Sequence, residues 1–481
     1  MGYCEISALR GRLSKEPIGY LALLSEVSKG EELLDQMFTA ENFRRIFDTE
    51  NRKGLDVVGR FFPHLDPMTM SVHDKVAEIR EWRKGKAAVS VADFEAGEIK
   101  LKSELVELKA NKSAAIDTEM EKLSTAVAAP GFKLALIQKI GPKAKPVYCI
   151  DGTAETFFVV KQLQRNIYRI YKVKQANRHD LACRVRDTVG SGFPFELLRT
   201  DVSDFYESVD RKLLYTKLDQ DQLLSSSSKR FIRQIFASYE AISGSPKGIP
   251  RGVGISAYLA ELFLRPVDRA VNELPGIVLY CRYVDDIVAV FARPPTGNTL
   301  GPYKALLVKI LNDHGLIHNE GKTAECDFGD KGGPKEFEYL GYKFLATIKT
   351  LEVSPSDAKI EKLRLRLEAA FAVYKQTVPT QSRNAFREIV ARVKFLTGNM
   401  RLKNSKSSAT TGIYYNNPIV TDLNKYKTLD ALLKKQIKAI KRPKLRASLF
   451  KYSFETGFAE RRFHNFSSRE LAVIVKAWQH V

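Results

Sequence analysis

Two apolar runs lie on either side of an acidic tetrapeptide near the middle of the chain. The first run is 276–280 (Gly-Ile-Val-Leu-Tyr), the second is 287–291 (Ile-Val-Ala-Val-Phe), and the residues between them end in Asp285-Asp286. Short runs rich in β-branched residues are typical of buried strands. The pattern therefore predicts a β-hairpin that carries two carboxylates at its tip.

A second acidic strand is predicted upstream. The apolar pair Leu197-Leu198 leads to Asp201, and a helix-like segment follows. An isolated Asp pair would be interpreted as a solvated turn, because Asp is common in turns and unpaired buried carboxylates are costly. With the second strand present, Asp201, Asp285 and Asp286 are candidates for one site, because two Mg²⁺ ions need bridging carboxylates from separate strands.

Hydrophobic spacing divides the chain into three predicted units. Residues 1–145 show helical periodicity, with a break at Pro63 and Pro67. Residues 146–350 hold both acidic strands, and residues 351–481 return to helical spacing. We therefore expect a sheet-containing central unit between two helical ones.

Basic and apolar residues alternate in the first part of the central unit, from Arg165 to Arg178. This alternation predicts a basic strand face that contacts triphosphate or template. The competing interpretation is an ordinary solvated face.

Composition points to a polyanionic partner. Among 481 residues, 77 Lys and Arg outnumber 56 Asp and Glu, which gives a net charge of +21. A charge this large predicts binding to nucleic acid. No stretch of roughly 18 apolar residues is present, so no membrane span is expected. No secretory signal opens the chain and the five cysteines are scattered, which predicts a cytoplasmic protein.

Five short segments resemble the motifs of reverse transcriptases, in the order of that family. Residues 201–206, 249–252 and 283–286 resemble motifs A, B and C, residues 319–323 resemble the motif D loop, and residues 339–342 resemble the primer-grip hairpin. Asp201 and Asp285 are 84 positions apart (285 − 201), with the glycine-containing loop between them. One such motif would be a weak signal, but five in order are specific.

The resemblance implies a fold and a cofactor. The fold is an α+β right-hand polymerase: a helical N-terminal extension (1–145), fingers and an antiparallel-sheet palm (146–350), and a helical thumb and C-terminal region (351–481). The cofactor is a pair of Mg²⁺ ions, for which Mn²⁺ is an alternative. The implied metal ligands are Asp201, Val202, Asp285 and Asp286.

The resemblance also implies how the nucleotide is held. Tyr206 matches the steric gate, whose ring would clash with a 2′-hydroxyl, so deoxynucleotides are the expected substrates; the competing interpretation is a core aromatic. Arg178 best matches the fingers arginine that contacts triphosphate. Arg251 and Gly252 match the motif B loop, although the commoner pattern has Gln where Arg251 stands.

Two further segments complete the implied active site. Lys322 is the candidate acid that protonates the leaving pyrophosphate, because a flexible ammonium near the metals suits that task. Its competing interpretation is a solvated lysine. Tyr339, Leu340, Gly341 and Tyr342 are the implied primer grip.

The function implied is RNA-directed DNA synthesis. The long N-terminal extension and the helical C-terminal half look most like the abortive-infection and defence-associated reverse transcriptases of bacteria, which implies an antiphage role, a noncoding RNA template, dNTPs and a DNA product. Some relatives there are oligomeric, so a homo-oligomer is a further expectation. Template-independent or protein-primed DNA synthesis, RNA synthesis, and a non-catalytic RNA-binding scaffold are the alternatives.

Overall fold

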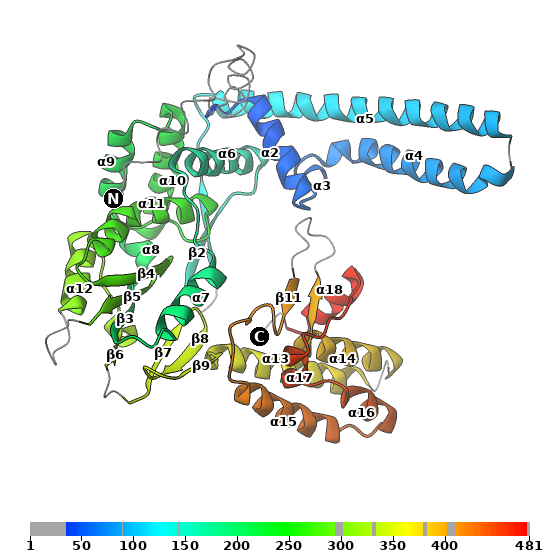
Figure 1. The fold of residues 1–481 in the computed structure, drawn as a ribbon. Helices are drawn as coiled ribbons and strands as arrows, with labels where there is room; N and C mark the ends of the chain where they lie inside the picture. Colours follow the sequence, from blue (N-terminus) through cyan, green and yellow to red (C-terminus); the bar gives the residue numbers. More distant parts are fainter. Residues whose placement is uncertain are drawn as a thin grey trace, which may run out of the picture.

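The structure is a computed structural model, and it describes residues 35–88, 90–141, 145–293, 302–329, 333–378, 382–401 and 410–478. The described chain is a mixed α+β protein that is mostly helical, with antiparallel sheets. This confirms the predicted α+β class (Figure 1). No described helix is both long and apolar enough to cross a membrane.

A four-stranded antiparallel sheet forms the centre of the molecule. Its strands lie in the order β4-β5-β3-β6. They are β3 (Phe195–Asp201), β4 (Ile277–Tyr283), β5 (Asp286–Ala292) and β6 (Ala324–Phe328). The predicted acidic hairpin is thus β4–β5, and the predicted upstream acidic strand is β3, its neighbour in the sheet.

Alternate residues of the central strands face two separate hydrophobic cores. Ile287, Ala289 and Phe291 of β5 pack in one core with helices α10 (Ser226–Ser243) and α11 (Gly254–Asn272). Val288 and Val290 pack in the other core, with α7 (Arg178–Val189) and a three-stranded sheet. Both faces of the sheet are therefore buried, which explains why β5 reads as one continuous apolar run.

The three-stranded sheet is made of β7 (Lys335–Tyr339), β8 (Tyr342–Ala346) and β9 (Leu351–Pro355). Strand β9 pairs with β8, so the sheet-containing unit extends past the boundary that the sequence predicts at residue 350. Helical structure begins with α13 (Asp357–Thr377).

The N-terminal part is helical, as predicted, and ends in a β-hairpin. Its helices are α2 (Ala40–Arg52), α3 (Val57–Phe61), α4 (Asp66–Lys84) and α5 (Val91–Ala128). Helices α4 and α5 pack together as an arm that extends away from the central sheet (Figure 1). Strand β1 (Leu136–Ile140) pairs with β2 (Pro146–Ile150), so the predicted boundary at 145/146 falls inside a hairpin.

The predicted basic strand is wrong, because residues 154–171 form helix α6 (Ala154–Tyr171). The Thr153 side chain caps the helix by accepting a hydrogen bond from the Thr156 amide. Phe158, Leu163 and Ile167 are fully buried at helical spacing. The period-2 alternation covers only a few residues, and the longer helical spacing decides the structure.

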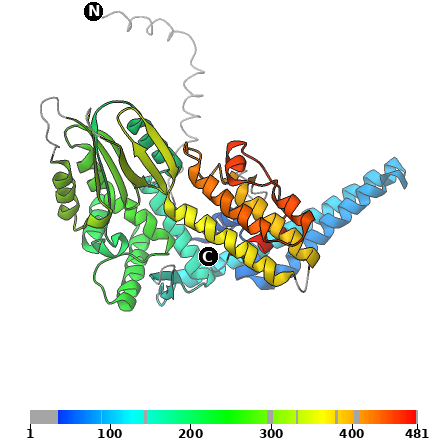
Figure 2. The same ribbon diagram turned by 90° about the horizontal axis from the view of Figure 1, so that it is seen from below.

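The C-terminal region is a group of helices with one small hairpin. After α13 come α14 (Ser382–Thr397), α15 (Asn424–Lys438), α16 (Pro443–Leu449), α17 (Phe454–Ala459) and α18 (Ser468–Lys476). Figure 2 shows α13, α14 and α15 lying side by side. Strands β10 (Asn399–Arg401) and β11 (Thr410–Gly412) pair beside them, which the helical spacing did not predict.

Candidate active site

The three predicted aspartates meet at one edge of the central sheet. Asp201 is the last residue of β3 and Asp286 is the first of β5, and the two are directly paired across the strands. Asp285 precedes Asp286 in the hairpin turn, and its carbonyl accepts a hydrogen bond from the Val202 amide (3.2 Å). Residues 84 positions apart are thus neighbours, because β3 and β5 are adjacent strands.

The turn that carries Asp285 has a strained backbone. It contains only two residues, Val284 and Asp285, between the paired Tyr283 and Asp286. Val284 has φ +59°, a left-handed conformation that is unfavourable for a β-branched residue. Strain of this kind is held by surrounding structure and is frequent at functional sites.

A buried ion network supports this turn from below. Arg282, with a side chain only 7% exposed, donates a hydrogen bond to the Val284 carbonyl (2.9 Å). The same guanidinium pairs with Asp268 (2.6 Å) and Glu261 (2.8 Å) of α11. These two carboxylates raise the pKa of Arg282 against the effect of burial. The network fixes the strained turn to a long helix.

Burial and mutual repulsion disfavour the charged carboxylates. Burial raises the pKa of Asp285, and the neighbouring Asp201 raises it further. Burial also raises the pKa of Asp286 to about 6, although Arg199 favours its charged form. The Arg199 guanidinium lies 3.1 Å from Asp286 Oδ1 without donating a hydrogen bond to it. The site therefore favours the arrival of positive charge.

Lys322 and Arg251 join Asp201 and Asp285 around one hollow of about 560 Å³. Lys322 belongs to a short 3₁₀ helix, η4 (Glu320–Lys322), and its ammonium contacts the Asp201 carboxylate directly. The Lys322 carbonyl accepts a hydrogen bond from Arg199 (2.7 Å), which holds η4 against β3. Its side chain is 55% exposed, so Lys322 is ion-paired and also accessible to solvent.

Tyr206 lies beside the acids on helix α8 (Phe205–Ser208), and Arg251 covers its ring. Gly252, which follows Arg251 in the motif B loop, has φ +100°. A Cβ at Gly252 would lie 2.5 Å from Val147 Cγ1 and 2.7 Å from the Tyr148 carbonyl. Glycine is therefore required for the loop to approach β2. Both Arg251 and Gly252 line the hollow of about 770 Å³ that adjoins the acids.

The turn between β7 and β8 borders the same larger hollow. Leu340 and Gly341 form it, between the buried rings of Tyr339 and Tyr342. Arg178, the first residue of α7, donates a hydrogen bond to the Leu340 carbonyl (2.7 Å). The structure thus places Arg178 at the implied primer-grip turn.

One comparison decides the family of this region. Residues 161–344 match the family model described as "Reverse transcriptase (RNA-dependent DNA polymerase)". The chain carries a reverse transcriptase domain. The match spans β3, the β4–β5 hairpin, η4 and the β7–β8 turn, so it includes every aspartate of the site.

Solved structures show more distant similarity. The "Structure of telomerase from Candida albicans in complexe with TWJ fragment of telomeric RNA" is 14% identical with a TM-score of 0.33, and the match covers 75% of this chain but only 65% of that one. The apo telomerase from Candida tropicalis, truncated from its C-terminal domain, is 12% identical with a TM-score of 0.32, covering 57% of this chain and 73% of that one. No curated protein matches the chain.

The acids of the reverse transcriptase domain fit a divalent cation in part. Among the described residues, no group of three His, Cys, Asp or Glu side chains could hold a metal ion. The predicted set is not one such cluster, and Asp286 lies beside Arg199 and does not line the hollow of about 560 Å³ with Asp201 and Asp285. Asp201 and Asp285 remain, and Mg²⁺ is commonly held by one or two carboxylates with substrate phosphates and water. These two carboxylates fit that coordination.

Lys145 is a site residue that the sequence argument missed. It precedes β2, lines the hollow of about 560 Å³ with Asp201 and Asp285, and lies 3.0 Å from Asp204. Arg178, the residue that the sequence predicted to contact the triphosphate, does not line this hollow but lines the larger one of about 770 Å³. The sequence does contain a second basic segment, from Lys139 to Lys145. This segment reaches the site only because the β1–β2 hairpin packs against the motif B loop.

Proposed function

We propose that the chain synthesises DNA on an RNA template at the edge of the central sheet. The observation that carries this proposal is the meeting of Asp201, Asp285, Lys322 and Arg251 around one hollow, inside the segment that matches the reverse transcriptase model. In this proposal the central sheet is the palm, β1–β2 and α6 belong to the fingers, the β7–β8 turn is the primer grip and α13 begins the thumb.

The acids would hold two divalent cations, Mg²⁺ or Mn²⁺, through Asp201, Asp285 and the carbonyl of Val202, while Asp286 lies against the Arg199 guanidinium. When bound, such ions activate the primer 3′-hydroxyl and neutralise charge on the triphosphate. The raised pKa values of Asp285 and Asp286 support this, because each buried carboxylate is stabilised by a nearby cation.

Two cationic side chains would then act on the triphosphate. Lys145 lines the hollow with the acids and would attract and orient the phosphates. Lys322 would transfer a proton from Nζ to the leaving pyrophosphate oxygen. Its contact with Asp201 supports this role, because the ammonium reaches a carboxylate of the proposed metal site.

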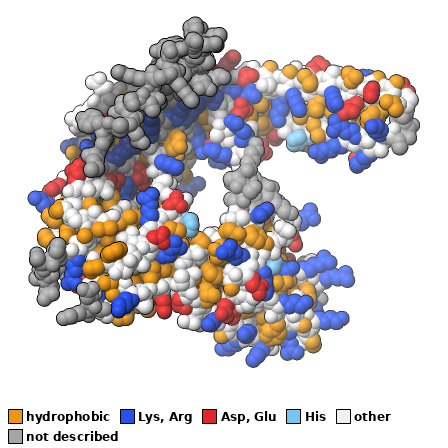
Figure 3. Space-filling view, viewed as in Figure 1, with side chains coloured by type: hydrophobic (Ala, Val, Ile, Leu, Met, Phe, Trp, Pro, Cys, Tyr) orange, Lys and Arg blue, Asp and Glu red, His pale blue; other side chains and the backbone are white. Residues whose placement is uncertain are grey.

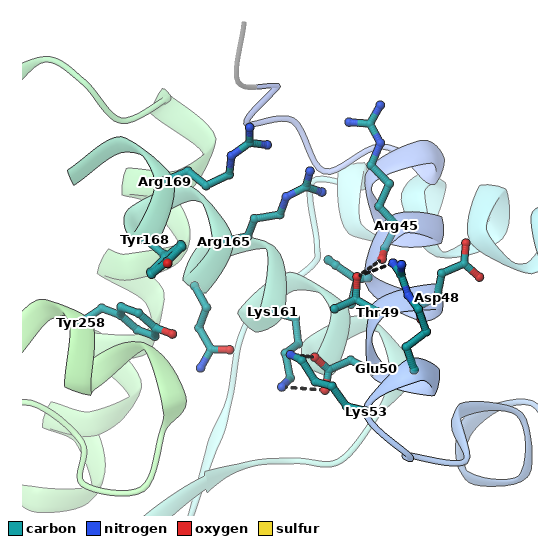
Figure 4. Close-up of a pocket in the computed structure, with 13 residues that line it drawn as sticks. Arg45, Asp48, Thr49, Glu50, Lys53, Lys161, Arg165, Tyr168, Arg169 and Tyr258 are labelled. Atoms are coloured by element: carbon teal, nitrogen blue, oxygen red, sulfur yellow. Dashed lines mark hydrogen bonds and ion pairs between the residues drawn. The ribbon is translucent and has the colours of Figure 1, made fainter. Parts of the chain in front are cut away.

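A basic hollow beside the active site supports binding of a single-stranded template. It encloses about 630 Å³ between α2 and α6, and Tyr258 from α11 closes one side (Figure 4). Arg45, Arg165 and Arg169 line it, while the carboxylate of Glu50 is neutralised by Lys53 and Lys161. The Tyr168 ring lies edge-on to Tyr258 at 6.2 Å. Cations interleaved with aromatic rings suit a strand with exposed bases.

The C-terminal helices offer a second basic surface, which supports a structured noncoding RNA as the template. Figure 3 shows Lys and Arg side chains gathered over these helices. The exposed members on α15 and around α16 are Lys427, Lys434, Lys435, Lys438, Lys441, Arg442 and Lys444. Together with the helical arm, this region supports an antiphage role by its likeness to defence-associated reverse transcriptases.

The proposed function is tested by primer extension. The purified protein is given an RNA template, a DNA primer and labelled dNTPs with Mg²⁺, and the product is sequenced. Asp285→Asn removes one metal ligand and should lower incorporation at least about a hundredfold. The matched control is Asp210→Asn, which keeps the N-cap of α9 (Arg211–Asp221), because Asn caps a helix as well as Asp.

Each outcome separates the candidate functions. A product complementary to the template, lost in Asp285→Asn and kept in Asp210→Asn, supports the proposal. A product of unrelated sequence would favour template-independent synthesis, and a product that stays attached to the protein would favour protein priming. No incorporation by the wild type, with RNA still bound, would favour a scaffold.

A further inference from the structure

Arg251 holds two consecutive residues of helix α8. Its guanidinium carbon lies 5.2 Å from the centre of the Tyr206 ring, in a cation–π contact. A terminal nitrogen of the same guanidinium lies 3.2 Å from both carboxylate oxygens of Glu207. One side chain thus covers the face of the Tyr206 ring and is tethered to the next residue.

The backbone around Arg251 fixes this arrangement. The Ile249 amide donates to the Tyr206 carbonyl (2.7 Å), so the motif B loop runs directly against α8. Gly248 has φ +89°, and a Cβ there would lie 3.0 Å from the Glu207 backbone. On the other side, the Arg251 carbonyl accepts a hydrogen bond from the Tyr148 amide of β2 (2.7 Å). Arg251 therefore links α8 to the β1–β2 hairpin.

The contacts of Arg251 are directed at α8 even though two carboxylates lie in the same hollow. Asp201 and Asp285 line it, yet the carboxylate that Arg251 pairs with is Glu207. Its Nε is buried without a hydrogen-bond partner, which is unfavourable for a donor. The stacking on Tyr206 and the ion pair with Glu207 therefore outweigh the cost of leaving Nε without a hydrogen-bond acceptor. These two contacts decide where the guanidinium lies.

We propose that Arg251 is a positioning residue for the Tyr206 ring and thereby sets the discrimination between deoxynucleotides and ribonucleotides. This rests on the proposed function, in which Tyr206 excludes the 2′-hydroxyl. A ring excludes that hydroxyl only while its position is fixed, and Arg251 restrains the ring by covering one face while Glu207 restrains Arg251. A glutamine, the commoner residue here, has no charge for either contact.

The competing role for Arg251 is direct binding of the triphosphate, and the two roles predict different kinetics. Loss of a phosphate contact raises KM for dNTPs and NTPs alike, so the ratio of their kcat/KM values stays constant. Loss of ring positioning raises kcat/KM for the NTP selectively, so the ratio falls. Glu207→Gln separates the roles further, because it breaks the tether without removing the guanidinium.

The test measures kcat/KM for a dNTP and the matching NTP. Arg251→Gln should lower the dNTP/NTP ratio about tenfold, Glu207→Gln should lower it less, and Arg251→Lys should retain part of it. In a Tyr206→Ala background Arg251→Gln should change the ratio no further, because the two residues act as one unit. Arg233→Gln is the matched control, since Arg233 also lies over a ring, Tyr215 at 5.8 Å, and also pairs with an acid, Asp219.

Fluorine NMR of 3-fluorotyrosine at position 206 tests positioning without any turnover. A second or displaced resonance in Arg251→Gln, absent in Arg233→Gln, is expected whether or not the protein incorporates nucleotides. The proposal is overturned if that resonance is unchanged, or if Arg251→Gln leaves the dNTP/NTP ratio intact. Failure of the proposed function alone would appear as no incorporation with the resonance still displaced.

Discussion

Two hairpin turns border the same hollow, and they differ in how their backbone conformation is supported. The β4–β5 turn places Val284 at φ +59°, whereas the β7–β8 turn places Leu340 at φ +48° and Gly341 at φ +70°. A left-handed conformation costs a non-glycine residue roughly 1–2 kcal/mol. In the first turn the buried Arg282 network holds the Val284 carbonyl, while the second uses glycine at one of its two positions.

The difference teaches where this protein tolerates strain. The turn that carries Asp285 is held by a buried guanidinium and two carboxylates on α11, so its geometry depends on distant residues. In the turn implied to hold the primer, the Leu340 carbonyl accepts a hydrogen bond from Arg178, which is exposed and not part of a buried network, and glycine takes the second position. Four substitutions or conditions test this contrast.

Arg282→Met should have the largest effect. It leaves Asp268 and Glu261 as buried carboxylates without their cation and removes the donor to the Val284 carbonyl. Breaking a buried ion pair costs about 3–5 kcal/mol, and urea denaturation measures it. The matched control is Arg364→Met, which also loses two carboxylate partners, Glu361 and Glu368, but on an exposed face of α13. Exposed pairs contribute about 1 kcal/mol or less, so equal losses would contradict the account.

Gly341→Ala should be next. The alanine would be strained at φ +70°, by about 1–2 kcal/mol, and its Cβ would lie 2.7 Å from Lys359 Cε and 3.0 Å from Arg178. Gly315→Ala is the control, because Gly315 has the same φ with no atom within 4 Å. Both variants should lose similar stability, since flexible side-chain ends move aside, but only Gly341→Ala should weaken primer binding. Equal primer affinity would show that the turn does not contact the primer.

The pH dependence of Asp286 should give a smaller effect. Its pKa is raised to about 6 in the folded protein, so its contribution to stability is present at acidic pH and is lost as the pH rises through about 6. The quantity to measure, with a chelator present, is the unfolding free energy of the wild type minus that of Asp286→Asn. This difference should therefore decrease as the pH is raised from 4.5 to 7.5. The attraction of Arg199 for the ionised carboxylate grows over this range, and the raised pKa is the net of this attraction and the larger effect of burial. A constant difference would contradict the raised pKa.

Val284→Gly should have the smallest effect on stability. Relief of the left-handed strain, about 1–2 kcal/mol, is largely offset by the greater freedom of glycine in the unfolded chain, about 0.5–1 kcal/mol. The free energy of unfolding should change by less than about 1 kcal/mol. A larger loss would mean that the Val284 side chain, and not its backbone, stabilises the turn.

The sequence predicted the parts of the site that lie within continuous apolar runs. The strand leading to Asp201 and the hairpin carrying Asp285 were predictable because both faces of the sheet are buried, and such strands read as apolar runs.

The remainder depends on tertiary contacts that local patterns do not contain. Glu261 and Asp268 read as surface acids of a helix, and only the sheet brings Arg282 to them. The second half of helix α6, from Arg165, was predicted as a strand because a short alternation of basic and apolar residues was given more weight than the longer helical spacing. Lys145 was missed because its place in the site depends on the hydrogen bond between Tyr148 and Arg251.

Binding of Mn²⁺ tests most directly whether this strained turn exists to present a cation site. Electron paramagnetic resonance of free Mn²⁺, titrated with the protein at neutral pH, measures bound metal without requiring catalysis. The account predicts that the wild type and Asp210→Asn bind Mn²⁺ and that Asp285→Asn does not. Arg282→Met should bind Mn²⁺ more weakly than the wild type. Equal binding by the wild type and Asp285→Asn would contradict it, because Asp285 would then not be a ligand.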